Sequence, residues 1–361
     1  MNQQWHPQPA TRSAELPCGL PDAMDRPGRF FLRLTGLAAV VLLVFVVVSF
    51  MLLKLGAAPS VVLLGGPDAI AENRAQLAAD YGLDQPAIIQ LIRYAVRTLT
   101  GEFGRSWLSG DRVAGELLRR IPATLELMTY SLLLGALIGI PAGIAAGFNR
   151  GGPEDRTVRG AGILGEAMPA FLIALLLLLV FFRWLDIAPA PAGRISVVLT
   201  PPLSITGSYF IDAVLTQDSV AARSALGQLM LPVLSLSLLV ASALMLQVRG
   251  AILTQLHTAH LAYARAQGMS HDMLTAIALR GAVPTIWASF CAQFATLIGT
   301  TAVVEYVFAW GGVGQYGLDA MVKADFAAVQ GFILLCGVFA VLIHLLHGAA
   351  RHAARIRIRR A

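Results

Sequence analysis

The chain consists largely of long apolar stretches. A helix of about 20 apolar residues is needed to cross about 30 Å of hydrocarbon. Five stretches of that length contain no Lys, Arg, Asp or Glu, and a sixth at residues 160–182 contains only Glu166. The charge-free stretches are residues 34–53, 127–148, 225–248, 281–304 and 326–346. We therefore predict an all-α integral membrane protein with six transmembrane helices.

The composition also indicates that most of the chain lies in a lipid bilayer, because charged residues make up only 13% of the chain, about half the share in a soluble domain. The first stretch, residues 34–53, is too long for the apolar core of a signal peptide, and only a weak cleavage site follows it. We expect it to remain as a membrane helix. A processed signal anchor is the alternative.

The positive charges predict the orientation, because cytoplasmic loops carry an excess of Lys and Arg. Arginines precede the stretch at 34–53, follow those at 127–148 and 225–248, and end the chain. The loop after the stretch at 281–304 instead has Lys323 against Glu305, Asp319 and Asp325. Both termini are therefore expected in the cytoplasm. The net charge of +6 requires no nucleic-acid partner, since this asymmetry and contact with anionic membrane lipid account for it.

These spans and loops predict three regions. A permease domain at residues 30–349 lies between a cytoplasmic N-terminal tail at 1–29 and a basic cytoplasmic tail at 350–361. The permease domain contains an external insertion at residues 55–122 and a cytoplasmic loop at residues 249–282.

The external insertion contains one clear helical segment, "DQPAIIQLIRYAV", where Asp84 can act as the N-cap and Pro86 suits the first turn. Its apolar positions share one face, so we expect this helix to lie against the outer rim of the membrane domain, with ligand binding as the alternative. These positions are Ile88, Ile89, Leu91, Ile92 and Val96. A second external segment, residues 186–223, is rich in Pro, Ser and Thr and is expected to be an irregular loop.

Motifs of enzymes and metal sites are absent from the sequence. Neither lysine, Lys54 or Lys323, follows the Gly-rich turn of a P-loop, and HExxH, GxSxG and closely spaced cysteine pairs do not occur. We expect no catalytic residue, no metal and no cofactor in this chain. A proton-driven carrier needs several ionisable groups inside its spans, and here they are only Glu166 and His344. A pore-forming subunit driven by a partner therefore fits best, with a stand-alone proton-coupled carrier or channel as the alternative.

Four residues interrupt the apolar spans. Pro141, Pro169 and Pro232 each predict a kink, which packing alone explains better than gating at any one of them. A charge such as Glu166 costs about 2.5 to 3.5 kcal/mol at the bilayer centre on insertion scales. We expect Glu166 near the cytoplasmic end, paired or protonated, and a role in the translocation pathway is the functional alternative.

The cytoplasmic loop, "AILTQLHTAHLAYARAQGMSHDMLTAIALRGAVP", predicts two short helices around Gly268, which suits the left-handed residue that ends a helix. Ser270 suits the N-cap of the second helix, with Asp272 in its first turn. Leucines form one side, and three alanines form a surface that another protein can approach closely. The leucines are Leu253, Leu256 and Leu261, and the alanines are Ala262, Ala264 and Ala266.

The segments "AYARAQG" and "ALRGAVP" resemble the cytoplasmic signature loop of ABC-transporter importer permeases, in the form found in the dipeptide, oligopeptide and nickel family. "YGLDQP", "GEFGRS", "IPATLEL" and "VVEYVFAWGGVGQYGLDAMVKADFAAVQG" resemble that family in order and spacing. The chain departs from the pattern at Ala262, where the family has an acidic or polar residue. The stretch from Gly268 to Pro284 is also a residue or two shorter than expected.

The resemblance implies a type I ABC importer permease fold in a bacterial inner membrane. It implies a second, homologous permease subunit, two cytoplasmic ATPase subunits that bind ATP and Mg²⁺, and an extracytoplasmic solute-binding protein. The solute would be a di- or oligopeptide, with nickel chelates, glutathione or another small solute as alternatives. The ATPase-coupling residues carried over are Tyr263, Ala264, Arg265, Ala266, Gln267 and Gly268.

Arg265 would pair with acidic or carbonyl groups of the ATPase, and a solvated or headgroup-bound arginine is the alternative. Glu305, Tyr306 and Trp310 are expected at the outer mouth, as a gate or a contact for the binding protein. An interfacial aromatic belt with a hydrogen-bonded Glu explains these three residues nearly as well.

Overall fold

The computed structural model describes residues 27–55, 85–106 and 109–360, and these residues form helices and connecting loops with no β-sheet. Most of the expected N-terminal tail and part of the external insertion, Asp84 included, lie outside the described residues, whereas the expected C-terminal tail continues helix α13 as far as Arg360. The helices are α1 (Pro27–Leu55), α4 (Ala87–Leu99), α5 (Val113–Phe148), α6 (Pro153–Ala167), α7 (Ala170–Leu177), a π-helix η2 (Leu178–Trp184), α8 (Tyr209–Leu215), α9 (Ser219–Leu256), α10 (Ala259–Ala266), α11 (His271–Val307), α12 (Val313–Val322) and α13 (Phe326–Arg360).

Four of the described helices are long and apolar enough to cross a membrane, namely α5, α9, α11 and the Phe326–Leu346 part of α13. The bent pair of α6 with α7 and η2 would make a fifth span. In α1, the described apolar segment is the shorter Thr35–Met51. The prediction of an all-α membrane protein is confirmed, and the number of six spans stays a prediction.

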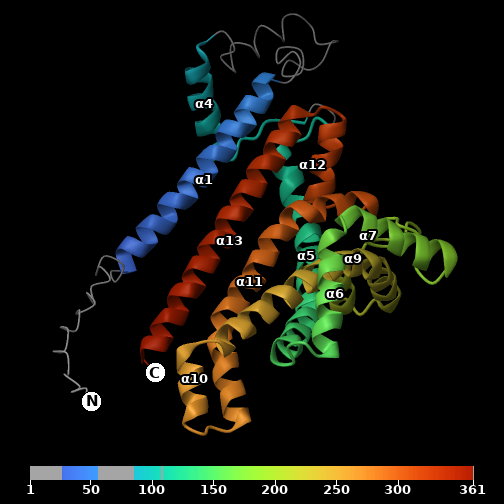
Figure 1. Cartoon of the computed structure of the whole chain (residues 1–361). Helices are drawn as coiled ribbons and strands as arrows, with labels where there is room; N and C mark the ends of the chain where they lie inside the picture. The colour runs from blue at the N-terminus through green and yellow to red at the C-terminus, as the bar shows by residue number, and fades with distance from the viewer. Residues whose placement is uncertain (1–26, 56–84, 107–108, 361) are drawn as a thin grey trace, which may run out of the picture.

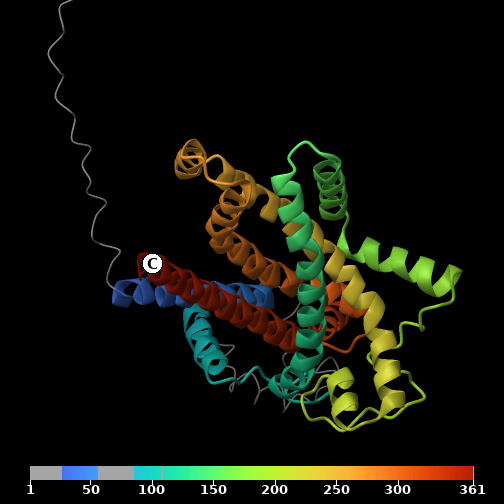
Figure 2. The ribbon, with the colours of Figure 1, turned by 90° about the horizontal axis from the view of Figure 1, so that it is seen from below.

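The kink predicted at Pro169 is present and divides the apolar stretch at residues 160–182 between α6 and the pair of α7 and η2. The axes of α6 and α7 differ by 102°, and the chain turns at Met168 and Pro169. Proline has no N–H for the helical ladder and disfavours the helical conformation of the residue before it, and Met168 is accordingly extended. Pro141 and Pro232, by contrast, lie inside the continuous helices α5 and α9. Both views show α7 extending away from the bundle (Figures 1 and 2).

The α5–α9 seam is the most extensive helix packing among the described residues. Four glycines of α5, spaced four residues apart, lie against α9, and a Cβ at any of them would come within 2.6–2.8 Å of an α9 atom. Glycines at this spacing allow the backbones of two membrane helices to approach closely. They are Gly135, Gly139, Gly143 and Gly147. On α6, Gly162 and Gly165 make similar contacts with α9, so α9 is the central helix of this group.

Helix α1 lies at the edge of the bundle, beside α13 (Figures 1 and 2), where Phe45 covers Gly337. The expected external helix forms as α4 and packs on α1. The hydroxyl groups of Tyr94 and Ser49 are 2.8 Å apart, which supports the expectation that α4 lies against the rim. Pro86 is the N-cap residue rather than a residue of the first turn.

The expectation of an irregular loop at residues 186–223 is only partly correct, because α8 and the first turn of α9 form within it. Ser208 and Asp218 cap these two helices with their side chains. Along the long axis of the molecule, α10, the start of α1 and the end of α13 lie at one end, and α4 and α12 lie at the other (Figure 1).

Candidate functional site

Helix α10 lies between the ends of α9 and α11 and projects from one end of the bundle (Figure 1). Its inner side packs on α11, where Leu261 and Ala264 form an apolar cluster with Leu274 and Ala278. Leu261 is fully buried and Ala264 is 7% exposed. The cluster holds α10 firmly against the rest of the chain, because burial of an aliphatic side chain contributes about 1.5–3 kcal/mol.

The turn after α10 has the predicted conformation. Gly268 has φ +77°, in the left-handed region that glycine adopts without steric cost. Its N–H donates to Arg265 O at 3.1 Å, and the next N–H, of Met269, donates to Ala264 O at 3.3 Å. Ser270 then caps α11 by accepting a hydrogen bond from Met273 N. The predictions for Gly268 and Ser270 are confirmed.

The predicted docking surface, called the docking surface below, is the outer side of α10 and this turn. It consists of Ala262, Tyr263, Arg265, Ala266 and Gln267, all of which are exposed. Tyr263 is 67% exposed, and its hydroxyl accepts a hydrogen bond of 2.8 Å from Gln267 Nε2. The expectation that Ala264 belongs to this surface is wrong, because Ala264 lies on the opposite side of α10 and packs on α11.

An ion pair that the sequence analysis did not predict lies near this surface. Arg249 of α9 donates from Nε to Asp155 Oδ1 and from Nη2 to Oδ2, the second at 3.0 Å. Asp155 belongs to the first turn of α6, and its Oδ2 also accepts from Gly151 N at 2.9 Å. Sequence alone could not pair these residues, because 94 positions separate them.

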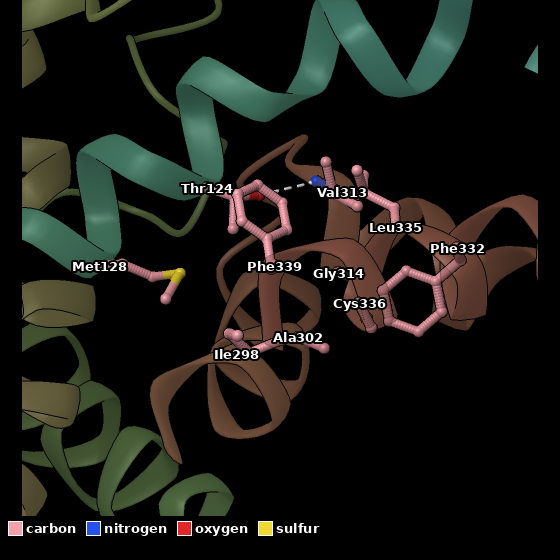
Figure 3. Close-up of a pocket in the computed structure, with 10 residues that line it drawn as sticks. All are labelled: Thr124, Met128, Ile298, Ala302, Val313, Gly314, Phe332, Leu335, Cys336 and Phe339. Atoms are coloured by element: carbon pink, nitrogen blue, oxygen red, sulfur yellow. Dashed lines mark hydrogen bonds between the residues drawn. The ribbon is translucent and has the colours of Figure 1, made fainter. Parts of the chain in front are cut away.

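At the opposite end, Glu305 is fully buried and joins three helices. Its Oε1 accepts from the hydroxyl of Thr124 on α5 at 2.6 Å, and its Oε2 accepts from Gln315 N on α12 at 2.9 Å. The same Thr124 hydroxyl accepts from Val313 N at 2.8 Å (Figure 3). A Cβ at Gly312 would collide with the Glu305 carboxyl group, so the turn requires glycine there.

Trp310 is also interior, at 1% exposure, and its Nε1 donates to Ala123 O at 3.0 Å. Of the three residues expected at the outer mouth, only Tyr306 is exposed, at 49%. A direct contact of Glu305 or Trp310 with a binding protein is therefore not compatible with their burial, and the hydrogen-bonded Glu of the alternative is the arrangement found. A gating role for this cluster stays a prediction.

The external loop is also held to the spans by buried polar contacts. Arg194 Nη2 donates to Glu126 Oε2 at 2.6 Å, and Ser208 Oγ donates to Glu126 Oε1 at 2.5 Å. The Arg194 guanidinium lies 3.8 Å from the centre of the Tyr209 ring. Sequence analysis missed this cluster because Glu126 directly precedes an apolar stretch without a recognisable partner.

A cavity between α5, α11, α12 and α13 is lined by Met128, Ile298 and Cys336 among other residues (Figure 3). Its volume of about 20 Å³ holds about one water molecule, too little for a transported solute. Glu166 lies elsewhere, near the end of α6, exposed and without an ion-pair partner among the described residues. Its pathway role stays a prediction.

Comparison with known proteins gives the family. A model of binding-protein-dependent transport system inner membrane components matches residues 139–359. The chain is 37% identical to the probable D,D-dipeptide transport system permease protein DdpB of Escherichia coli K12, over 77% of this chain and 81% of that protein. It is 29% identical to the dipeptide transport system permease protein DppB of the same strain, over 88% and 95%.

Another relative is the metal-staphylopine import system permease protein CntB of Staphylococcus aureus Mu50, which is 27% identical over 83% of this chain and 89% of that protein. The family model covers more than half of the chain. The chain is therefore a multi-pass bacterial inner-membrane protein that belongs to the family of binding-protein-dependent transport system inner membrane components.

Proposed function

We propose that this chain forms half of the translocation pathway of an ATP-driven importer whose solute is a di- or oligopeptide. The peptide class rests on the names of its relatives, which include permeases for dipeptides and D,D-dipeptides. Relatives for metal-staphylopine and glutathione keep other small solutes as alternatives. The second permease, two ATPases and a binding protein are the partners that such a system requires.

The observation that carries the proposal is the exposed, rigidly mounted surface on α10. Tyr263, Arg265 and Gln267 project from a helix whose opposite side is packed on α11. Arg265 has no acidic partner among the described residues, so its guanidinium is available for acidic or carbonyl groups of an ATPase. ATP hydrolysis then belongs to the partner, and this chain receives the movement.

Alternating access follows from the connection of α10 to the spans. Helix α10 is joined to α9, and the glycines of the α5–α9 seam bind α5 closely to α9. A displacement of α10 on ATP binding would therefore move α9 and α5 together, and would change the side of the membrane to which the pathway opens. Both termini would lie with α10 in the cytoplasm, with six spans crossing the membrane.

Helix α11 provides the best wall for the pathway. Between residues 291 and 307 its exposed residues are Ala292, Ala295, Thr296, Gly299 and Tyr306, with no large aliphatic side chain among them. The exposed side of α1, by contrast, carries Leu43, Val44, Val48 and similar residues, as lipid contact requires. The small and hydroxyl-bearing side of α11 suits contact with water and a polar solute.

Reconstitution tests the function. We expect proteoliposomes containing both permeases, both ATPases and the binding protein to take up a labelled dipeptide only when ATP is present on the ATPase side. The control contains the two permeases without the ATPases. Peptide uptake by this control at the rate of the full complex would support the stand-alone carrier and refute the importer.

A further inference from the structure

The Asp155–Arg249 ion pair joins two membrane helices at the end of the molecule that carries α10. Of the other described ion pairs, those of Glu116 lie within α5, and Arg194 joins a loop to Glu126. Two parallel N–H···O bonds fix direction as well as distance. The pair therefore defines how the start of α6 sits against α9.

Burial makes this pair costly to break. The Asp155 side chain is 2% exposed and that of Arg249 is 18% exposed. Removal of one partner leaves the other charge without compensation in a poorly hydrated position, which is the most destabilising change to such a pair. Glu154, on the same turn of α6, is exposed and forms no ion pair among the described residues. It can therefore lose its negative charge without disturbing the Asp155–Arg249 pair.

The pair lies close to the docking surface. Arg249 precedes the end of α9 at Leu256 by seven residues, about 10 Å along the helix, and α10 begins at Ala259. In the turn between α5 and α6, Arg150 Nη1 lies 3.4 Å from Nε2 of His257, the C-cap residue of α9. This turn and the start of α6 therefore contact α9 at two points, and the Arg150–His257 contact lies at the α9–α10 junction.

We propose that Asp155 and Arg249 are positioning residues that transmit the movement of α10 to α6. The glycine contacts between α6 and α9 bring the two helices close together. The ion pair adds a directional contact that fixes their relative position at the end where the ATPase would act. This inference rests on the proposed function, because it assumes that α10 receives the movement of an ATPase.

The test compares Asp155→Asn with Glu154→Gln in the complete reconstituted complex, after ATP-dependent dipeptide uptake has been established for the wild type. Both variants remove one negative charge from the same turn, and only the first breaks the pair. The measured quantity is the number of dipeptides taken up per ATP hydrolysed. We expect this ratio to fall at least about fivefold for Asp155→Asn, the size of a typical coupling between sites, and to be unchanged for Glu154→Gln.

Arg249→Lys keeps the charge but loses the paired hydrogen bonds, so its ratio should fall less than that of Asp155→Asn. This variant decides the question if Asp155→Asn does not assemble. A wild-type ratio in either variant of the pair, or an equal loss in Glu154→Gln, overturns the inference. Absence of ATP-dependent uptake in the wild-type complex would instead refute the proposed function.

Discussion

At the scale of single residues, Gly268 is the most specific requirement of the docking surface. With φ +77°, this position imposes a backbone penalty of about 1–2 kcal/mol on other residues, although an added Cβ would meet no atom within 4 Å. We predict that Gly268→Val reaches the membrane and pairs with the second permease at the normal level. Its complex should bind the ATPases poorly or hydrolyse ATP without transport, as measured by ATPase and uptake rates on the same preparation.

The matched control for Gly268→Val is Gly160→Val. Gly160 is exposed on α6, an added Cβ there meets no atom, and its φ is not positive. The control should retain transport. Wild-type transport in both variants would mean that the shape of the turn does not matter for coupling.

A second single-residue prediction concerns Glu305, at the opposite end of the molecule. Glu305→Ala leaves the Thr124 hydroxyl and the Gln315 N–H without their acceptor in a buried site, at a cost of about 1–3 kcal/mol each. We predict a lower unfolding temperature of the purified permease pair. Tyr306→Phe, a change at an exposed neighbour, should leave it unchanged, and equal temperatures for both variants would contradict the role of the Glu305 contacts.

At the scale of elements, the α5–α9 seam depends on small side chains. In Gly139→Leu the new Cβ would lie 2.7 Å from Ala241 O, so the helices must separate, and overpacking of this kind costs about 1–3 kcal/mol. We predict reduced amounts of folded protein in the membrane, measured by fluorescence-detected size-exclusion chromatography. Gly115→Leu is the control on the same helix, because an added Cβ there meets no atom.

The pathway role of α11 predicts a pattern of reactivity. In a background lacking Cys18, Cys291 and Cys336, Thr296→Cys should react with a charged, membrane-impermeant thiol reagent in the assembled complex, because water supports the thiolate. Leu43→Cys, on the exposed side of α1, should not react. Equal protection of both cysteines would exclude Thr296 from a water-filled pathway.

At the scale of the whole molecule, the arginine distribution predicts which end of the molecule lies in the cytoplasm. Glu102 follows α4, Glu154 lies in the first turn of α6, and both are exposed. In the same cysteine-free background, Glu102→Cys should be labelled by an impermeant reagent from outside the cell. Glu154→Cys should be labelled only after the membrane is opened, and the reverse pattern would overturn the predicted orientation.

The resemblance of its motifs indicated the family, and the sequence by itself determined the all-α membrane class and the turn at Gly268. These features follow from local information: the length of an apolar stretch, the absence of a Cβ at a left-handed residue, and the hydroxyl of an N-cap at Ser270. The four-residue spacing of the glycines in the α5–α9 seam is present in the sequence, but the sequence analysis did not predict their packing on α9.

Only the tertiary structure decided which residues meet across the bundle. It placed Ala264 inside, turned α6 away from α7 by 102°, buried Glu305 and Trp310, and paired Asp155 with Arg249. Nothing in the local sequence distinguishes an exposed carboxylate from one that accepts hydrogen bonds from a distant helix. The difference arises because a buried polar group must find its partners wherever the packing of helices brings them.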